Sequence, residues 1–151
     1  MQHSTQNALA LLKADHAQVK QLFADFEALS DRSKVSKKRL AERICAALRV
    51  HTRLEEEIFY PAIREAIEDD DLMDEALVEH AAAKDLIEQI EALDPDDELY
   101  DARIKVLSEQ IDHHVEEEEG QMFEQAADSS ADLVALARQM SELKRALERA
   151  D

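Results

Sequence analysis

The apolar residues of this chain recur every three or four positions along most of its length, and only short polar breaks separate the periodic stretches. That spacing is typical of α-helices, because residues so spaced share one face of the helix. Only one glycine and two prolines occur in 151 residues, so few positions interrupt a helix. The pattern predicts an all-α protein, with helices over about 5–29, 35–68, 72–93, 95–127 and 130–149.

Short loops between long helices predict an antiparallel up-down arrangement, because a few residues cannot return the chain to the end it came from. We expect a single domain over 1–151, in which an antiparallel four-helix bundle occupies about 5–127. An additional C-terminal helix is expected at about 130–149. Its apolar face predicts that it packs across the bundle or pairs with a second subunit, so the protein is expected to be a monomer or a homodimer.

Three local signals mark where helices should begin or bend. Asp94 and Pro95 predict an N-cap and the first turn of the fourth helix. Ser129, followed three residues later by Asp132, resembles a capping box that opens the fifth helix. Pro61 lacks a backbone N–H and is expected to kink the second helix or to end its regular part.

Charge and cysteine content limit the partners of the chain. Its formal net charge of −18 repels polyanions, so we expect no nucleic-acid partner and no binding to an anionic membrane surface. No stretch approaches the roughly 20 apolar residues that span a bilayer, and no secretory leader is evident. The single Cys45 excludes an internal disulfide and a cysteine-only metal site. These features predict a cytoplasmic protein for which a metal cation is a natural partner.

Each of the first four expected helices places a histidine on its apolar face, where a leucine would be expected. Burying these groups without a partner would cost several kcal/mol each, which is comparable with the stability of a whole domain. Imidazole and carboxylate groups together are a ligand set that suits iron, manganese or zinc. The predicted metal ligands are His16, His51, Glu55, His80, His114 and Glu118.

The spacing of the acidic candidates favours two metal ions. Glu55 follows His51 by four residues, and Glu118 follows His114 by four, so each pair lies one turn apart, about 6 Å along the helix axis. Each glutamate can therefore reach from one ion to the next. Two ions bridged in this way would lie roughly 3.5–4 Å apart. Because neutral imidazole is the ligand, metal binding is expected to weaken below about pH 6.

Several neighbours have less specific signals. Glu119 is an alternative bridging residue, and Glu56 is a candidate additional ligand. The phase of His113 on its helix predicts an exposed side chain or one that only supports the ligands. Cys45 is expected to fill the core, and Gly120 to allow a close approach or to mark a local irregularity.

The chain resembles the hemerythrin-like, HHE cation-binding family over about 7–127. The resemblance rests on the segment from His51 through Glu55 and Glu56 to Pro61 and on its second copy from His113 to Phe123. It implies an oxo- and carboxylate-bridged, non-haem di-iron centre with four terminal histidines and two bridging glutamates. Lys84 and Glu119 stand where oxygen-carrying members have histidine and aspartate, which favours oxygen, peroxide or nitric oxide chemistry, or sensing, over reversible oxygen transport.

Three functions are consistent with the sequence. The first is a di-iron protein that binds or senses oxygen or a related small oxidant, or that handles iron, with manganese and zinc as alternative metals. The second is a peroxide-decomposing, catalase-like di-iron oxidoreductase. The third is a helical interaction module without metal. A ferritin-like site is disfavoured, because no histidine has a glutamate three residues before it.

Overall fold

The computed structural model describes residues 6–30 and 32–150, and within them only helices and short connections occur. An all-α fold is therefore confirmed. The elements are α1 (Ala8–Glu27), α2 (Lys34–Leu54), a π-helical turn η1 (Glu55–Phe59), α3 (Tyr60–Ile67), α4 (Asp70–Glu91), α5 (Tyr100–Glu117), a second π-helical turn η2 (Glu118–Met122), α6 (Phe123–Ala127) and α7 (Leu133–Ala150).

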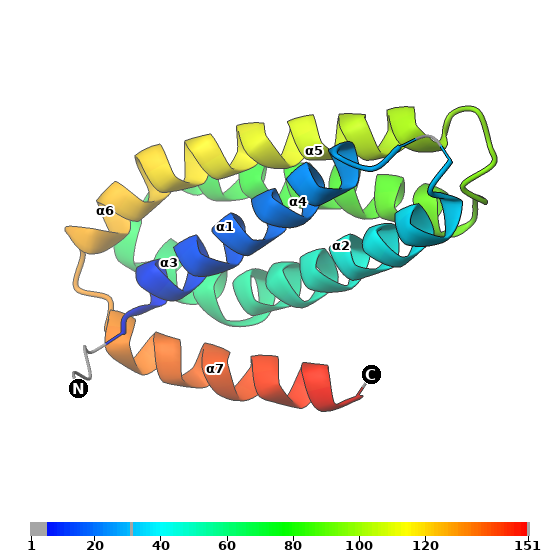
Figure 1. Ribbon diagram of the computed structural model, residues 1–151. Coiled ribbons are helices and arrows are strands. Elements are labelled where there is room, and N and C mark those ends of the chain that lie inside the picture. Colours follow the sequence, from blue (N-terminus) through cyan, green and yellow to red (C-terminus); the bar gives the residue numbers. More distant parts are fainter. Residues whose placement is uncertain (1–5, 31, 151) are drawn as a thin grey trace.

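The elements before α7 form an antiparallel bundle of four rods. One rod is α1, the next is α2 continued through η1 and α3, the third is α4, and the fourth is α5 continued through η2 and α6 (Figure 1). This is the predicted hemerythrin-like bundle. The fifth predicted helix, α7, lies along the outside and contacts α1, α2 and η1, so its apolar face packs on its own bundle.

Hydrogen bonds to side chains fix the first turns of α1 and α4. The Ala10 amide donates to the Asn7 side chain at 2.9 Å, and α1 begins directly after Asn7. Thr5, where the sequence pattern predicted the start of this helix, lies outside the described residues. The Leu72 amide donates to Asp69 at 3.2 Å, which starts α4 two residues earlier than predicted.

The predicted start of the fourth helix at Asp94 and Pro95 is wrong. Two successive turns occupy this segment, in which Asp97 donates its amide to the Asp94 carbonyl and Tyr100 donates to the Asp97 carbonyl. The Asp97 side chain also accepts from the Leu99 amide at 2.8 Å, which offers the backbone an alternative to a helix. The helix therefore begins at Tyr100, whose side chain is buried in the core.

The predicted capping box before α7 is also wrong in detail. Asp132 is the capping residue, since its side chain accepts from the Ala135 amide at 3.0 Å. The Ser129 hydroxyl instead donates to the Ala126 carbonyl at 2.7 Å and so closes the end of α6. The sequence signal named the right segment but assigned the cap to the wrong member of the pair.

Both long rods widen from α-helix to π-helix at the same place. In η1 the Tyr60 amide donates to the Glu55 carbonyl, and in η2 the Phe123 amide donates to the Glu118 carbonyl. An irregularity near Pro61 was predicted, and the α-helix of the second rod does end at Leu54, is followed by η1, and resumes as α3 with Pro61 in its first turn, where a missing amide is tolerated. Gly120 lies within η2, and a Cβ there would meet nothing within 4 Å, so it marks the irregularity and not a close approach.

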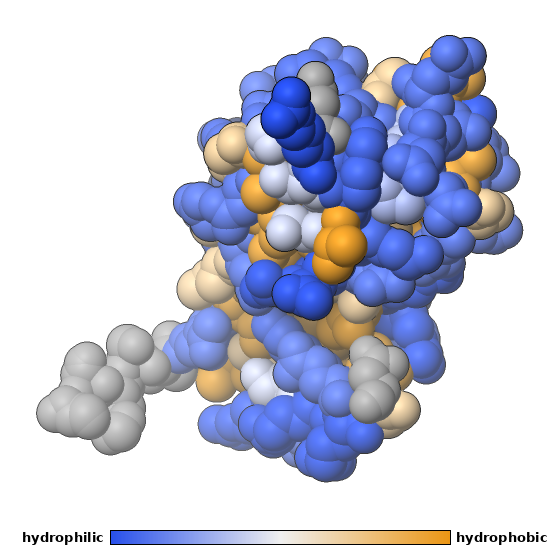
Figure 2. Space-filling view, turned by 45° about the vertical axis from the view of Figure 1, so that its right-hand side comes forward, coloured by the Kyte–Doolittle hydropathy of each residue, from blue (hydrophilic) through white to orange (hydrophobic). Residues whose placement is uncertain are grey.

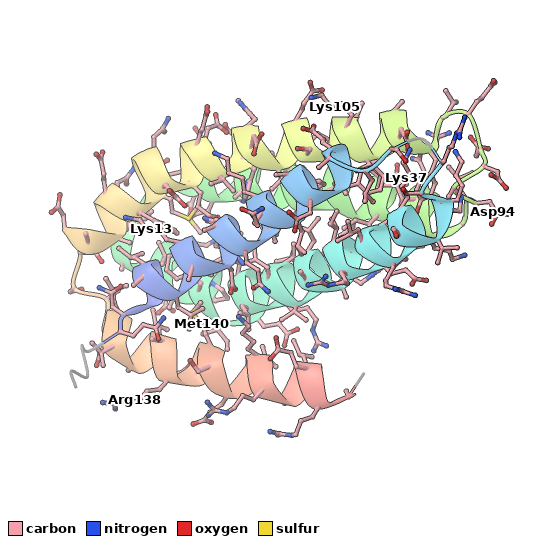
Figure 3. The ribbon with its side chains drawn as sticks, viewed as in Figure 1. Lys13, Lys37, Asp94, Lys105, Arg138 and Met140 are labelled. Carbon is pink, nitrogen blue, oxygen red and sulfur yellow. The ribbon has the colours of Figure 1, made fainter. Side chains whose placement is uncertain are left out.

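Two apolar cores fill the two ends of the bundle. The first core joins α1, η1, α3, α4, α6 and α7 around residues such as Leu12, Phe59 and Met140. The second core joins α1, α2, α4 and α5 around residues such as Ile44 and Leu48. In Figure 3, Met140 points from α7 towards the bundle, whereas Arg138 points away from it. The predicted metal ligands form a polar layer between the two cores.

The surface agrees with the strong net charge. Figure 2 shows a face that is mostly hydrophilic, on which hydrophobic residues appear as small patches. Among the described residues, none of the helices is long and apolar enough to traverse a lipid bilayer.

Candidate metal centre

The six predicted ligands converge in the middle of the bundle. They come from α1, α2, η1, α4, α5 and η2, and none of their residues is more than 8% exposed. The helical phase of the apolar stripes thus placed all six correctly on the inside. Glu55 and Glu118 are the most deeply buried, at 0% and 1% exposure.

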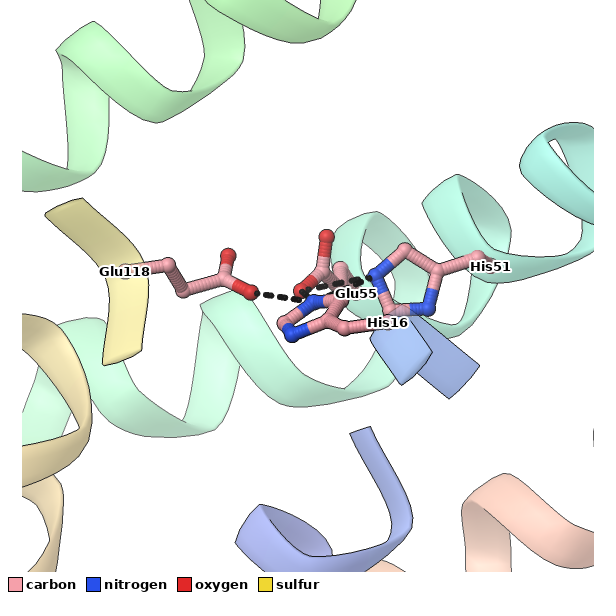
Figure 4. A group of neighbouring side chains, drawn as sticks. All are labelled: His16, His51, Glu55 and Glu118. Carbon is pink, nitrogen blue, oxygen red and sulfur yellow. Dashed lines mark hydrogen bonds and ion pairs between the residues drawn. The ribbon is translucent and has the colours of Figure 1, made fainter. Parts of the chain in front are cut away.

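These residues form two groups that share both glutamates. One group contains His16, His51, Glu55 and Glu118, and the other contains His80, His114 and the same two glutamates. In the first group the Nε2 atoms of His16 and His51 face each other at 3.1 Å. In Figure 4 the Glu118 carboxylate and the His51 ring approach from opposite sides, with His16 and Glu55 between them.

Each shared glutamate directs one oxygen to each group. Glu55 Oε2 lies 3.3 Å from His51 Nε2, and Glu55 Oε1 lies 2.9 Å from His80 Nε2. Glu118 Oε1 lies 3.1 Å from His16 Nε2, and Glu118 Oε2 lies 3.2 Å from His114 Nε2. This division of oxygens is the arrangement that two bridging carboxylates need.

Two of these oxygens have an unmet requirement that a cation would satisfy. Glu55 Oε2 and Glu118 Oε1 are buried without a well-aligned hydrogen bond, and each lies beside an imidazole nitrogen. Buried carboxylate oxygens without a donor are costly, and metal coordination is one of the few ways to compensate them. The residues therefore fit a metal ion in the first group.

Each of the four histidines is held from behind by a carboxylate on its second ring nitrogen, Nδ1. The pairs are His16 with Glu119 at 2.6 Å, His51 with Asp15 at 3.3 Å, His80 with Glu56 at 2.7 Å and His114 with Glu79 at 2.6 Å. Such a bond orients the ring and leaves Nε2 free to face a metal. Glu119 and Glu56, expected as a possible bridge and an additional ligand, thus support histidines instead.

Sequence reasoning missed Asp15 and Glu79. Each directly precedes a predicted ligand, His16 or His80, and each reaches the histidine of the neighbouring rod. This repeated acid–histidine pair is the signal that could have found them. Two lysines extend the network, since Lys144 of α7 lies 2.7 Å from Asp15 and Lys84 lies 2.8 Å from Glu56.

Without cations, the carboxylates keep protons on two of the histidines. Burial lowers the pKa of His51, but Glu55, Asp15 and Glu118 outweigh it and raise the pKa to about 10. Burial likewise lowers the pKa of His114, and Glu118, Glu55 and Glu79 raise it to about 9. Both imidazolium groups must lose a proton before Nε2 can bind a metal.

Tyr60 is a further member of the centre that sequence reasoning missed. Its hydroxyl donates to Glu118 Oε2 and lies 3.2 Å from both Glu55 Oε1 and His80 Nε2, and 3.3 Å from His114 Nε2. Burial and the two glutamate charges raise the pKa of Tyr60 well above its ordinary value. Bound cations act in the opposite direction, because they stabilise the phenolate.

Two remaining candidates, His113 and Cys45, are not among the inward-facing groups. The His113 side chain is exposed, as its phase predicted, and it lies 3.4 Å from Glu117 and 3.8 Å from Glu79, the acid behind His114. Cys45 is buried in the second core, between α1, α2, α4 and α5. Desolvation there raises the pKa of its thiol to about 11, so Cys45 is a core residue as predicted.

A small cavity lies beside the candidate centre. It has a volume of about 220 Å³ and touches His16, His51, His80 and His114. Apolar side chains form much of its wall, including Val19, Leu48, Ala83 and Ile87. Drug-sized ligands occupy sites of roughly 300–1,000 Å³, so this space suits a molecule of a few atoms.

The fold and the site together define a class: four-helix bundles that carry histidine and glutamate metal ligands between their helices. Residues 7–126 match the family model described as the hemerythrin HHE cation binding domain. The chain belongs to this family.

Two known proteins illustrate the relationship. A hemerythrin HHE cation-binding domain-containing protein from Mycobacterium kansasii has the same fold, with a TM-score of 0.80, 20% identity, and coverage of 96% of this chain and 89% of that one. A DNA nickase from Nostoc sp. is 29% identical over 117 residues, which are 78% of this chain. The matching region is only 32% of the length of that nickase.

Proposed function

We propose that this chain is a non-haem di-iron protein that binds or senses oxygen or a related small oxidant such as peroxide or nitric oxide, or that handles iron. The observation that carries the proposal is the division of two buried glutamates between two pairs of histidines. Each oxygen of Glu55 and Glu118 faces a different pair. Two ions at these places would share both carboxylates.

The donor set supports iron, with manganese and zinc as alternatives. Imidazole and carboxylate suit all three metals, and the family is defined by cation binding. Terminal imidazoles would hold each ion, and the carboxylates at Nδ1 would orient them. Bound iron would supply redox chemistry towards an oxidant that enters through the apolar cavity.

Neither nucleic acid nor a membrane enters the proposal. The net charge of −18 repels polyanions, and the chain corresponds to about a third of the Nostoc nickase. The proposed partners are therefore iron and a small molecule.

The first test is metal content. The full chain, purified after growth with iron, is expected to contain two irons and to show a ligand-to-metal charge-transfer band in its absorption spectrum. His51→Ala and His114→Ala each remove one ligand from a different group and should lower the iron content. His113→Ala is the matched control and should retain it, because His113 is exposed and its contact with Glu79, at 3.8 Å, is longer than the 2.6 Å contact between Glu79 and His114. Undiminished iron in both ligand variants would refute the proposal.

The second test separates the functions. If the protein binds oxygen reversibly, adding oxygen to its reduced form should produce a stable charge-transfer absorption band. Removing the gas should abolish that band. Continuous consumption of peroxide would instead assign the catalase-like activity. A protein that never binds metal and that keeps its helicity and self-association with chelator present would be the interaction module.

A further inference from the structure

The two halves of the metal centre repeat each other. Each half has an acid followed by a histidine on one rod, and a histidine followed by two glutamates on the next. The corresponding residues are Asp15 and Glu79, His16 and His80, His51 and His114, Glu55 and Glu118, and Glu56 and Glu119. The π-helical turns follow the same repeat, since each begins at the shared glutamate.

The repeat is broken at the residue that follows each π-helical turn. In one half this residue is Tyr60, and at the corresponding place in the other half it is Phe123. The Phe123 ring stacks on His16, with the ring centres 6.1 Å apart. The Tyr60 ring lies 5.2 Å from the His80 ring. The two aromatic rings thus take similar places, and only one of them carries a hydroxyl.

The hydroxyl makes the two groups chemically unlike. It contacts four atoms at once: Glu55 Oε1, Glu118 Oε2, His80 Nε2 and His114 Nε2. These four atoms are the donors of the second group. In the first group, the corresponding oxygens Glu55 Oε2 and Glu118 Oε1 have no hydroxyl beside them and no well-aligned hydrogen bond.

We propose that Tyr60 is a fifth protein ligand of the metal ion in the His80 and His114 group, so that a small external ligand binds to the ion in the His16 and His51 group. The inference rests on the proposed di-metal centre and assigns its open position. As the oxygen–metal bond forms, the phenol releases its proton to solvent, as the imidazolium groups do. The ring of Phe123 cannot make the equivalent bond.

The decisive measurement is the resonance Raman spectrum of the iron(III)-loaded chain, excited in its visible band. A tyrosine bound to iron(III) gives enhanced ring vibrations. The chain has two tyrosines, and the other one, Tyr100, lies in the second core beside Phe26. Tyr60→Phe should abolish the vibrations, and the matched variant Tyr100→Phe should keep them. Vibrations that survive Tyr60→Phe would overturn the inference.

A second measurement does not require removal of Tyr60. Tyr100→Phe protein made with ring-deuterated tyrosine carries the label at Tyr60 alone, so the vibrations should shift. Unshifted vibrations would overturn the assignment. Wild-type protein that binds iron without any tyrosine vibrations would overturn this inference and leave the proposed function intact, whereas absence of iron binding would end both.

The mirror variant tests where the external ligand binds. Phe123→Tyr places a hydroxyl in the first group and should abolish the binding of azide, an anion whose own charge-transfer band reports it. Tyr60→Phe should still bind azide, because the first group is unchanged. Azide binding that is insensitive to Phe123→Tyr but lost in Tyr60→Phe would reverse the assignment and refute it.

Discussion

Raising the pH from 7 to 9 should strengthen metal binding at both groups. At pH 7 the metal-free chain protonates His51, with a pKa of about 10, and His114, with a pKa of about 9. The charged form therefore exceeds the neutral form about a thousandfold at His51 and about a hundredfold at His114. Each incoming ion must displace one of these protons.

The expected slope follows from that competition. Between pH 7 and 9 the apparent affinity of each group should rise about tenfold per pH unit, which is about 1.4 kcal/mol. The reference pKa of imidazole predicted weakening only below about pH 6. The carboxylates around the two histidines move this window upward, since they favour the protonated ring more strongly than burial disfavours it.

Calorimetric titration with zinc measures the metal affinity and the number of protons released on binding, without redox chemistry. Zinc is delivered from a competing chelator, and the titration is repeated in buffers of different ionisation enthalpy, which gives the number of protons released. About one proton per ion is expected at pH 7. An affinity that stays flat between pH 7 and 9, or binding at pH 7 without proton release, would refute the reasoning.

Three further outcomes are expected. Met140→Ala, at a fully buried position of α7, should lower the free energy of unfolding in urea by about 2–5 kcal/mol, whereas Arg138→Ala on the exposed face should change it by less than about 0.5 kcal/mol. Lys144→Met removes the partner of Asp15, which orients His51, and should weaken zinc binding at one group about 10- to 100-fold in the same titration; equal loss at both groups would contradict this. The raised imidazole pKa values stabilise the metal-free fold fully below about pH 6.5 and lose this effect as the pH rises through 9 to 10, so urea resistance without metal should fall over that range; resistance that rises would count against it.

The burial of the candidate ligands could be predicted from sequence because helical phase determines which residues face the core. His51 and Glu55 lie one turn apart in phase with Ile44 and Leu48, so a buried stripe carries all of them inward. Helix ends were less predictable. Asp94 has the residue type of a helix cap, but its backbone carbonyl and that of Asp97 accept the hydrogen bonds of two successive turns instead. Whether turns or a helix form there depends on tertiary contacts that the local sequence does not contain.

Tyr60 escaped prediction for a geometric reason. An α-helix turns about 100° per residue, so a residue five positions after Glu55 should point about 140° away from it. In η1 the backbone bond runs from Tyr60 to Glu55, and this wider turn brings the two side chains back to one face. Pro61 was visible in the sequence as a cause of irregularity, but whether the helix would kink or widen could not be predicted from it.

The acids behind the histidines link the centre to the packing of the rods. Asp15 of α1 holds His51 of the second rod, and Glu56 of the second rod holds His80 of α4, so a rod that supplies a candidate ligand also orients that of its neighbour. Rotating one rod by a single residue would turn its side chains by about 100° and break both kinds of contact at once. The centre therefore fixes the rotation of the rods more sharply than apolar packing alone, which tolerates exchange of similar side chains. The two halves of this repeat differ by the single hydroxyl of Tyr60, which would give two bound ions different coordination. Such a difference would let a small ligand bind to one ion only.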